Sequence, residues 1–249
     1  MKIPKQIHLC WLSGDEYPQT IKTCIESWQD IMPEYKIILW NKEKFENEIT
    51  ASFAIDALKA KKWAFAADYL RLYALYKYGG IYLDSDVQVY KSFDDLLDNE
   101  FFSGIEYFKP TGYIAIEAAI MGAIPHHPFL KECLETYDRL QFKKTDGTLD
   151  ETPITIRIAR LAESRGFKYL PMLQKLPDKM TLYPPHYFTN KNGEIVKGET
   201  YAIHHCEGSW RSEKHGILKR IILFVARYYR HPVCAVNNIV SKIRNKLNR

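Results

Sequence analysis

The sequence contains little cysteine and no long apolar run. Five cysteines are spread over 249 residues without a CxxC pair, which argues against a disulfide framework and against a structural zinc site. No stretch of about 18 uninterrupted apolar residues is present, so no membrane-spanning helix is expected. The first residues lack the apolar run of a secretory signal peptide. These absences predict a protein of the reducing cytoplasm.

Internal repeats and low-complexity segments are also absent, so the length suits one large domain with at most a small appendage. Hydrophobic residues make up 46% and charged residues 26%, as in ordinary globular proteins. Acidic residues are scarce in one region. Residues 211–249 hold ten Lys or Arg and one acidic residue, whereas the whole chain holds 35 Lys or Arg and 30 Asp or Glu. We therefore expect a catalytic domain at 1–212 and a basic tail at 213–249.

Apolar patterns and turn residues predict an α/β protein. The expected strands are 3–11, 35–40, 81–83, 87–90, 101–107, 114–121 and 201–205. The expected helices begin at Pro18, cover 51–78 in two pieces, run from His127 to about Phe142, and run from Thr152 or Pro153 to about Arg165. Residues 168–200 are expected to be mostly loop because four prolines interrupt them. A β-α-β opening favours parallel strands with helices on the sheet faces.

Asp84-Ser85-Asp86 directly follows the short apolar segment Ile81-Tyr82-Leu83. Ligands of open α/β sheets gather at the carboxyl ends of strands. Two neighbouring carboxylates repel each other unless a cation lies between them, and Mg²⁺ typically binds one or two carboxylates together with substrate phosphates. The triplet therefore suggests a clamp for a metal and a diphosphate. A polar turn is the other interpretation, because Asp and Ser are common turn residues.

Other polar residues are placed where they could join this triplet. Asp68 and Arg71 lie three apart on one face of an apolar helix, where they form either a surface ion pair or a buried pair that a ligand completes. Trp11 ends the first strand, where it serves as a core aromatic or as a stacking platform for a base. His204 and His205 end the last expected strand, and a neutral His there could be a third metal ligand.

The chain resembles a known enzyme family at these residues. The segment AFAADYLRLYALYKYGGIYLDSDV (64–87) is similar to the signature of DXD-containing sugar transferases related to the yeast initiating mannosyltransferases, especially their bacterial capsular-polysaccharide branch. IPKQIHLCWLSG, CIESW, the WN at 40–41, the HPF at 127–129 and IHHCEGSW match that branch in order. The resemblance covers about residues 3–211. The clostridial glucosylating toxins are more distant relatives.

This resemblance implies a GT-A type α/β fold, with a Rossmann-like mixed sheet flanked by helices. It implies retaining transfer of a hexose or N-acetylhexosamine from a UDP-sugar, with Mn²⁺ or Mg²⁺, to a growing surface polysaccharide. It also assigns residues to the nucleotide sugar: Trp11 stacks on the base, the backbone of Leu9 and Cys10 contacts the base edge, and Asp68 and Arg71 bind ribose, phosphate or donor sugar. Ser85 contacts the nucleotide sugar, and Ser209 and Trp210 contact the β-phosphate. Asp84 contacts both the ribose and the metal, and Asp86 and His204 bind the metal.

Glu117 interrupts the apolar run IAIEAAIMGA. An acidic residue in such a run is costly unless it faces a polar site or points outward. If it faces the site, Glu117 is a candidate for the catalytic group that a retaining enzyme presents to the sugar. The family has no agreed nucleophile. Family members often carry Asn near this position, where this chain has Ala118.

The basic tail has an amphipathic pattern. In ILKRIILFVARYYR (217–230) the four basic residues fall within about 100° of a helical wheel. This pattern predicts a helix at an anionic membrane surface, with residues 214–249 as the contact, or a terminal helix packed on the domain. The first alternative suggests a lipid-linked acceptor and a location on the inner face of the cell membrane.

Two other functions are weaker alternatives. A metal-dependent nucleotidyltransferase would want a Gly-rich basic loop after the first strand, and Trp11 to Gly14 offer one Gly and no Lys or Arg. A membrane-bound scaffold without activity would not need every polar site candidate in place. Nucleic acid is not an expected partner, because the positive charge is confined to the tail.

Overall fold

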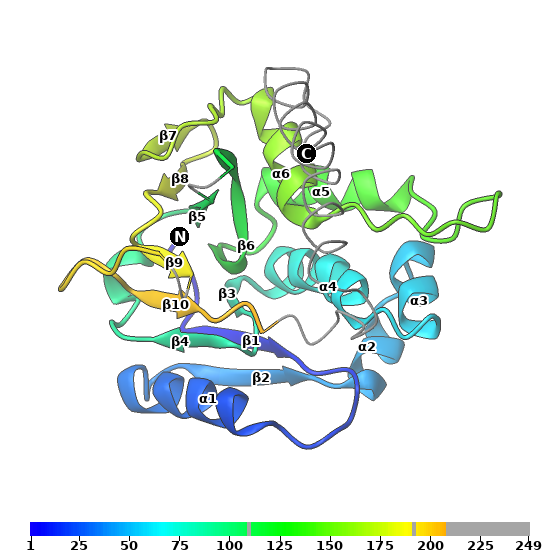
Figure 1. Ribbon diagram of the computed structural model, residues 1–249, viewed down its shortest axis with the longest axis horizontal. Coiled ribbons are helices and arrows are strands. Elements are labelled where there is room, and N and C mark those ends of the chain that lie inside the picture. Colours follow the sequence, from blue (N-terminus) through cyan, green and yellow to red (C-terminus); the bar gives the residue numbers. More distant parts are fainter. Residues whose placement is uncertain (109–110, 191–192, 208–249) are drawn as a thin grey trace, which may run out of the picture. The chain divides into compact units, whose positions relative to one another are not determined.

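The computed structural model describes residues 1–108, 111–190 and 193–207, and Figure 1 shows their arrangement. Ser209, Trp210 and the basic tail lie outside these described residues. The helices are α1 (Gln19–Ile31), α2 (Lys42–Glu48), α3 (Ser52–Lys59), α4 (Trp63–Tyr78), α5 (Pro128–Asp138) and α6 (Ile154–Glu163), with a 3-10 turn η1 (Asp94–Leu96). The strands are β1 (Gln6–Cys10), β2 (Lys36–Trp40), β3 (Gly80–Leu83), β4 (Val87–Val89), β5 (Phe101–Phe108), β6 (Tyr113–Ala123), β7 (Gln174–Leu176), β8 (Met180–Tyr183), β9 (Phe188–Asn190) and β10 (Ala202–His204).

Seven strands form the main sheet in the order β2-β1-β3-β6-β5-β8-β7. The first three strands along the chain, β1, β2 and β3, are parallel, as the β-α-β opening predicts. Beyond β3 the sheet is mixed, because β6 runs antiparallel to both β3 and β5. A second sheet of three strands has the order β4-β10-β9. The chain is therefore an α/β protein with a mixed sheet, in agreement with the expected fold class.

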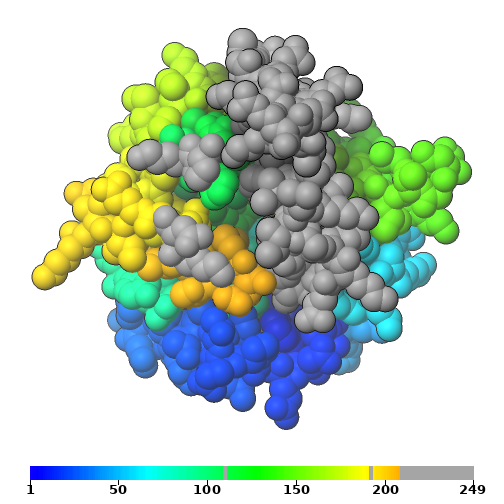
Figure 2. Space-filling model, viewed as in Figure 1, coloured from blue at the N-terminus to red at the C-terminus, as the bar shows by residue number. Residues whose placement is uncertain are grey.

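Helices α3 to α6 cover one face of the main sheet, and α1 together with the small sheet covers the other. Neighbouring residues of one strand belong to different hydrophobic clusters, because successive side chains of a strand point to opposite faces. Tyr82 packs with the helical cluster of α3 to α6, whereas Ile81 and Leu83 pack with Trp28 of α1 and with the small sheet. Burial on both faces explains why the central strands read as nearly continuous apolar runs. In Figure 2 the atoms of β9 and β10, in yellow to orange, border the blue N-terminal part of the chain.

The crossing from α4 to β3 depends on two glycines. Gly79 and Gly80 have φ of 63° and 100°, in the left-handed region that glycine tolerates best. A Cβ on Gly80 would lie 2.7 Å from the Gln6 carbonyl oxygen. The pair thus ends α4, as expected, and lets β3 enter the sheet beside β1. This geometry places the end of β3, and the triplet that follows it, at the carboxyl edge of the parallel strands.

The structure contains some elements that the sequence analysis did not expect. The segment 168–200 is mostly loop, as expected, but it also contains three short strands, β7, β8 and β9, which pairing within the sheets stabilises despite the nearby prolines. Helix α2 was not expected, although Asn41 caps it by accepting a hydrogen bond from the Lys44 N–H. Helix α5 ends at Asp138, before the expected end at Phe142. Within the described part of the chain, no helix is long and apolar enough to cross a membrane.

Candidate active site

The Asp84-Ser85-Asp86 triplet forms a tight turn between β3 and β4. The Val87 N–H donates to the Asp84 carbonyl oxygen at 3.0 Å, and the Asp84 N–H donates to the Ala119 carbonyl oxygen of β6 at 2.8 Å. The turn residues therefore do occupy a turn, as the simpler interpretation held. The same turn also brings both carboxylates to the carboxyl end of β3, where ligands of α/β sheets bind.

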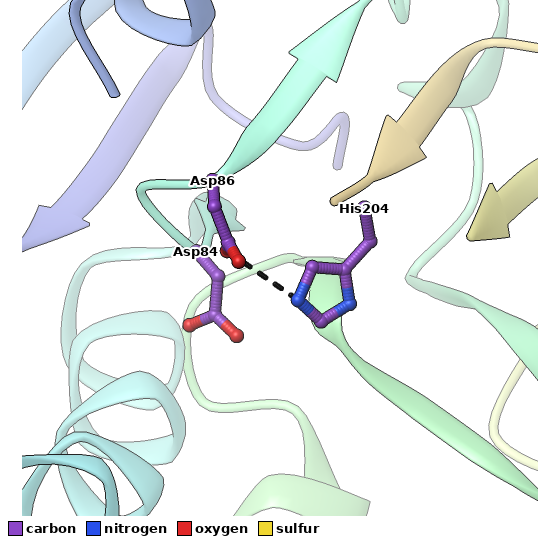
Figure 3. A group of neighbouring side chains, drawn as sticks. All are labelled: Asp84, Asp86 and His204. Atoms are coloured by element: carbon purple, nitrogen blue, oxygen red, sulfur yellow. Dashed lines mark ion pairs between the residues drawn. The ribbon is translucent and has the colours of Figure 1, made fainter. Parts of the chain in front are cut away.

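Asp84, Asp86 and His204 form a group that could hold a metal ion. One ligand atom from each residue lies within 4.8 Å of the other two. Figure 3 shows that the two carboxylates and the imidazole converge, although His204 comes from β10 at the far end of the described chain. Antiparallel pairing of His204 with Val87 in the small sheet holds them together. His205 points elsewhere and contacts Gln88, with its Nε2 3.1 Å from Oε1.

The donor set of this group fits a divalent cation. Two carboxylate oxygens suit Mg²⁺ or Mn²⁺, and an imidazole nitrogen is a common ligand of first-row transition metals. The His204 Nδ1 lies 3.8 Å from the Glu117 carboxylate. Metal-binding histidines are typically oriented by a carboxylate at their other nitrogen, and Glu117 occupies that position.

Asp86 and His204 form an ion pair in the absence of a cation. Their Oδ1 and Nε2 atoms are 3.4 Å apart, and the Glu207 N–H donates to the other Asp86 oxygen at 2.8 Å. Burial opposes ionisation of Asp86, but the His204 contact and the backbone N–H outweigh it and lower the pKa of Asp86 to about 2. Burial likewise lowers the pKa of His204, but Asp86 dominates and raises it well above its usual range. A bound cation would take the place of the His204 proton.

Arg71 positions Asp84. The Arg71 guanidinium lies 3.1 Å from Asp68 and 3.3 Å from Asp84, and it donates to the Ala118 carbonyl oxygen at 2.6 Å. The Tyr82 hydroxyl donates to the Asp84 Oδ1 atom at 2.8 Å, and Arg71 donates to the Oδ2 atom at 3.3 Å. Asp68 and Arg71 are 7% and 5% exposed, so they are buried and not a surface pair. The sequence analysis considered that a ligand would complete this buried pair. In the structure, Asp84 and the Ala118 carbonyl oxygen already provide partners for Arg71.

Asp68 is the less satisfied member of that pair. Burial raises the pKa of Asp68 to about 6, although the charge of Arg71 opposes this shift. The nearby Asp84 carboxylate adds to the increase. A carboxyl group held this close to neutrality beside a metal-binding candidate is a common property of functional sites.

Glu117 faces this site and does not point outward. It is 7% exposed, and its Oε1 accepts hydrogen bonds from the Ala118 and Ala119 N–H groups at 2.9 and 2.7 Å. The carboxylate is therefore held against the β6 backbone, 3.8 Å from the His204 Nδ1 atom. Its catalytic role remains a prediction.

Glu106 was missed by the sequence interpretation. It lies on β5 opposite Ala115, so it shares a sheet face with Glu117. Its Oε2 atom is buried and has no hydrogen-bond partner within the described residues. Burial, followed by the charge of Glu117, raises the pKa of Glu106 to about 8. The signal was the acidic residue within the apolar strand FFSGIEYF, which is the same kind of interruption that singled out Glu117.

The first strand ends beside the same site. The charges of Arg71, Asp84 and Asp68 all act on the Cys10 thiol, which places the end of β1 next to them. Leu9 is buried, so only its backbone could reach a ligand. The Trp11 ring is partly exposed, its Nε1 donates to the Asp15 carbonyl oxygen at 2.7 Å, and Tyr17 packs edge-on at 4.9 Å. Trp11 is thus fixed at the carboxyl end of β1 with part of its ring accessible.

Comparison with known proteins finds a matching family model. Residues 18–103, which include Asp68, Arg71 and the triplet, match the model described as "Glycosyltransferase sugar-binding region containing DXD motif". This part of the chain is therefore similar to the sugar-binding region of DXD glycosyltransferases. Its DXD motif is Asp84-Ser85-Asp86, the centre of the geometry described above.

The related curated proteins include yeast mannosyltransferases. Inositol phosphoceramide mannosyltransferase 3 of Schizosaccharomyces pombe is 32% identical over 56% of this chain and 38% of its own length. Inositol phosphoceramide mannosyltransferase 2 of the same yeast is 25% identical over 87% of this chain and 60% of its length. The mannosyl phosphorylinositol ceramide synthase SUR1 of Saccharomyces cerevisiae is 30% identical over 56% and 37%. The chain thus spans about 37–60% of the length of these relatives.

Solved structures of glycosyltransferases show a distant likeness. The PaToxG glycosyltransferase aligns with 66% of this chain and 70% of its own, at 17% identity and a TM-score of 0.49. The apo-form glycosyltransferase GlyE of Streptococcus pneumoniae aligns with 97% of this chain and 63% of its own, at 12% identity and a TM-score of 0.48.

Proposed function

We propose that this chain is a metal-dependent glycosyltransferase that moves a hexose or N-acetylhexosamine from a UDP-sugar. The convergence of Asp84, Asp86 and His204 at the carboxyl edge of the parallel strands carries this proposal. Three acidic groups, Asp68, Glu106 and Glu117, lie around that convergence without enough positive charge to balance them. Such an excess of carboxylates suits a cation and a hydroxyl-rich ligand.

A divalent cation bound there supplies positive charge to the diphosphate that leaves the sugar. Asp84, Asp86 and His204 are the residues that would hold it. Arg71 and Tyr82 fix the orientation of Asp84, and Glu117 fixes that of His204. These supports keep the ligand atoms in place before substrate arrives, so little reorganisation is needed during the reaction. Trp11 and the β1 backbone at Leu9 and Cys10 would contact the base, and Ser209 and Trp210 the β-phosphate.

The fold that we propose is of the GT-A type, and the transfer is proposed to retain the anomeric configuration. The anomeric carbon gains positive charge as the leaving group departs. Glu117 is the carboxylate that would face that carbon from β6. Glu106, one strand further from the metal-binding group, would contact a sugar hydroxyl, because its unpartnered oxygen is otherwise buried at a cost.

The acceptor is proposed to be a lipid-linked saccharide of a growing surface polysaccharide, such as a capsule. The names of the yeast relatives, which describe mannosyltransferases of inositol phosphoceramide, support a lipid-borne acceptor. The basic composition of residues 214–249 supports a peripheral location on the inner face of the cell membrane.

A panel of UDP- and GDP-linked sugars with Mn²⁺ tests the proposed function. Without acceptor, the correct donor is expected to be hydrolysed slowly, which is measured as release of the nucleoside diphosphate. Chelation of the metal is expected to stop this release. The proposal fails if hydrolysis continues at full rate in chelator, or if no nucleotide sugar in the panel binds.

A further inference from the structure

Exposed large hydrophobic residues are concentrated in one loop. Eight of them occur among the described residues, and four belong to the segment between α6 and β7. The four are Tyr169, Leu170, Met172 and Leu173, which are 38, 46, 54 and 45% exposed. Isolated exposed hydrophobic residues are normal, but a continuous group of them marks an interaction site. We name residues 168–173 the apolar loop.

The backbone of the apolar loop forms hydrogen bonds on its inner side. The Gln174 side chain accepts from the Lys168 N–H at 2.9 Å and donates to the carbonyl oxygens of Lys168 and Leu170 at 2.7 and 3.2 Å. The Leu170 and Met172 N–H groups donate to carbonyl oxygens two residues earlier. A loop that enters a non-aqueous environment must provide hydrogen-bond partners for its own backbone N–H and C=O groups, and this loop provides several of them.

The apolar loop is also anchored to the domain. Phe167, just before it, is buried, and the Tyr169 ring packs edge-on against Phe167 at 5.0 Å. The Tyr169 hydroxyl donates to Glu163 of α6 at 2.6 Å. Because the loop is held at both ends, its leucine and methionine side chains are presented outward and do not collapse onto the domain. Figure 1 shows this connection from α6 to β7 at the margin of the view.

The sequence around the apolar loop is rich in basic residues. Residues 160–179 contain two acidic residues, Glu163 and Asp178, and five basic ones, Arg160, Arg165, Lys168, Lys175 and Lys179. Arg165 forms ion pairs with Glu132 and Asp178, and Lys179 pairs with Glu100, so Lys168 and Lys175 are the lysines beside the loop that matter for an anionic partner. Lys168, the first residue of the loop, and Lys175, just after it, are exposed. Apolar side chains with flanking lysines are the pattern of a segment that rests in the interface of an anionic bilayer.

We propose that the apolar loop is a membrane-contact site, in which Leu170, Met172 and Leu173 enter the headgroup region of an anionic bilayer. Lys168 and Lys175 lie at the level of the lipid phosphates. This site belongs to the described domain and acts in addition to any contact that residues 214–249 make. It relies on the proposed function only for the choice of a membrane as partner, since binding to lipid requires no sugar transfer.

Vesicle co-sedimentation of the full chain tests this proposal. The probe is a vesicle of phosphatidylcholine with phosphatidylglycerol, compared with pure phosphatidylcholine. The double variant Leu170→Asp, Met172→Asp is expected to bind the anionic vesicles at least tenfold more weakly than the wild type. The matched control is Ile195→Asp, which changes a residue that is 65% exposed elsewhere and should bind like the wild type. Equal binding by the double variant and the wild type would overturn the proposal.

A second measurement separates insertion from simple adsorption. Leu170→Trp and Ile195→Trp are mixed with vesicles whose acyl chains carry bromine, which quenches nearby tryptophan. Added quenching is expected for Leu170→Trp and not for Ile195→Trp. If instead the double variant changes the oligomeric state in sedimentation velocity and leaves vesicle binding intact, the loop is a protein interface and the proposal is wrong. Metal-dependent UDP binding, measured on the same variants, reports separately on the proposed function.

Discussion

Two polar centres, one buried and one partly buried, border the same pair of strands, β1 and β3, and they differ in how completely the chain satisfies their hydrogen bonds and charges. At the start of the strands, His8 is fully buried, accepts a hydrogen bond from the Trp40 indole at Nδ1 and donates from Nε2 to the Gly79 carbonyl oxygen. At their carboxyl ends, Asp84 and Asp86 face further carboxyl groups, and one Glu106 oxygen has no partner in the described chain. The first centre is neutral and closed, whereas the second carries excess negative charge.

This difference separates structural polar groups from functional ones. A buried polar group with all its hydrogen bonds made stabilises one arrangement of the chain. A cluster of like charges costs stability, and it persists where a ligand supplies the missing charge and hydrogen bonds. We therefore expect changes at the His8 centre to alter the free energy of unfolding, and changes at the Asp86 centre to alter activity.

The largest expected effect comes from Asp86→Asn. This change removes one charged metal ligand at nearly constant volume, so sugar transfer should fall by about 10²–10³-fold, the usual range for loss of one charge-stabilising group. The melting temperature of the metal-free protein should change by only a few degrees. Steady-state kinetics and thermal unfolding of one preparation check both parts. Retention of most activity by a folded variant would contradict the metal-binding assignment.

The second effect is on stability. His8→Ala leaves the Trp40 N–H and the Gly79 carbonyl oxygen without their partner and opens a small cavity, which should cost about 3 kcal/mol of unfolding free energy. The kcat of the folded variant should stay within about twofold of wild type, because a folded scaffold keeps its site intact. His204→Ala is the matched control, with the reverse pattern expected. Urea denaturation and kinetics measure the pair, and similar profiles for both variants would remove the distinction between the centres.

The pH dependence of stability should show opposite signs at the two centres. Burial lowers the pKa of His8 to about 4, so only the unfolded chain binds this proton between pH 6.5 and 4. The His8 contribution is therefore complete above pH 6.5 and decreases by about 2 kcal/mol between pH 7 and pH 5. The raised pKa of Asp68 makes the folded state bind the extra proton between pH 6 and 3.8, so its contribution increases by about 1 kcal/mol over the same range.

Two variants separate these contributions. Relative to wild type, His8→Gln should lose less stability between pH 7 and pH 5, and Asp68→Asn should lose more. Urea denaturation at both pH values provides the comparison. Shifts of the same sign in both variants would show that at least one of the two pKa directions is wrong.

A smaller effect is expected at Glu106. Glu106→Ala should lower transfer or donor hydrolysis by about tenfold, since one hydrogen bond to a sugar is worth about 1 kcal/mol or slightly more. Glu106→Gln keeps a neutral group of the same shape and should recover most of that loss. If the KM for the donor changes and the KM for the acceptor does not, Glu106 contacts the donor sugar. If only the KM for the acceptor changes, Glu106 contacts the acceptor. Equal activity of the Ala and Gln variants would remove Glu106 from the site.

Local sequence signals predicted the centre of the site better than its surroundings. The DXD turn, the end of α4 at Gly79 and the parallel opening of the sheet depend on neighbouring residues, and all three were predicted correctly. The approach of Glu117 to His204 depends on the packing of segments that are distant in the chain, whereas the contact of Tyr82 with Asp84 joins residues only two apart. No local pattern encodes the long-range packing, so the position of Glu117 beside His204 could not be predicted. The strands β7 to β9 were also missed; they have three or four residues each, and β8 pairs with the distant β5 as well as with the neighbouring β7.

The most direct test of the account is UDP binding measured by isothermal titration calorimetry with Mn²⁺ and in chelator. We predict that wild-type protein binds UDP with Mn²⁺ and loses this binding in chelator. Asp86→Asn should bind weakly under both conditions, and His8→Gln should behave like wild type. Equal UDP affinity of the wild type with Mn²⁺ and in chelator would contradict the assignment of Asp84, Asp86 and His204 as a metal site.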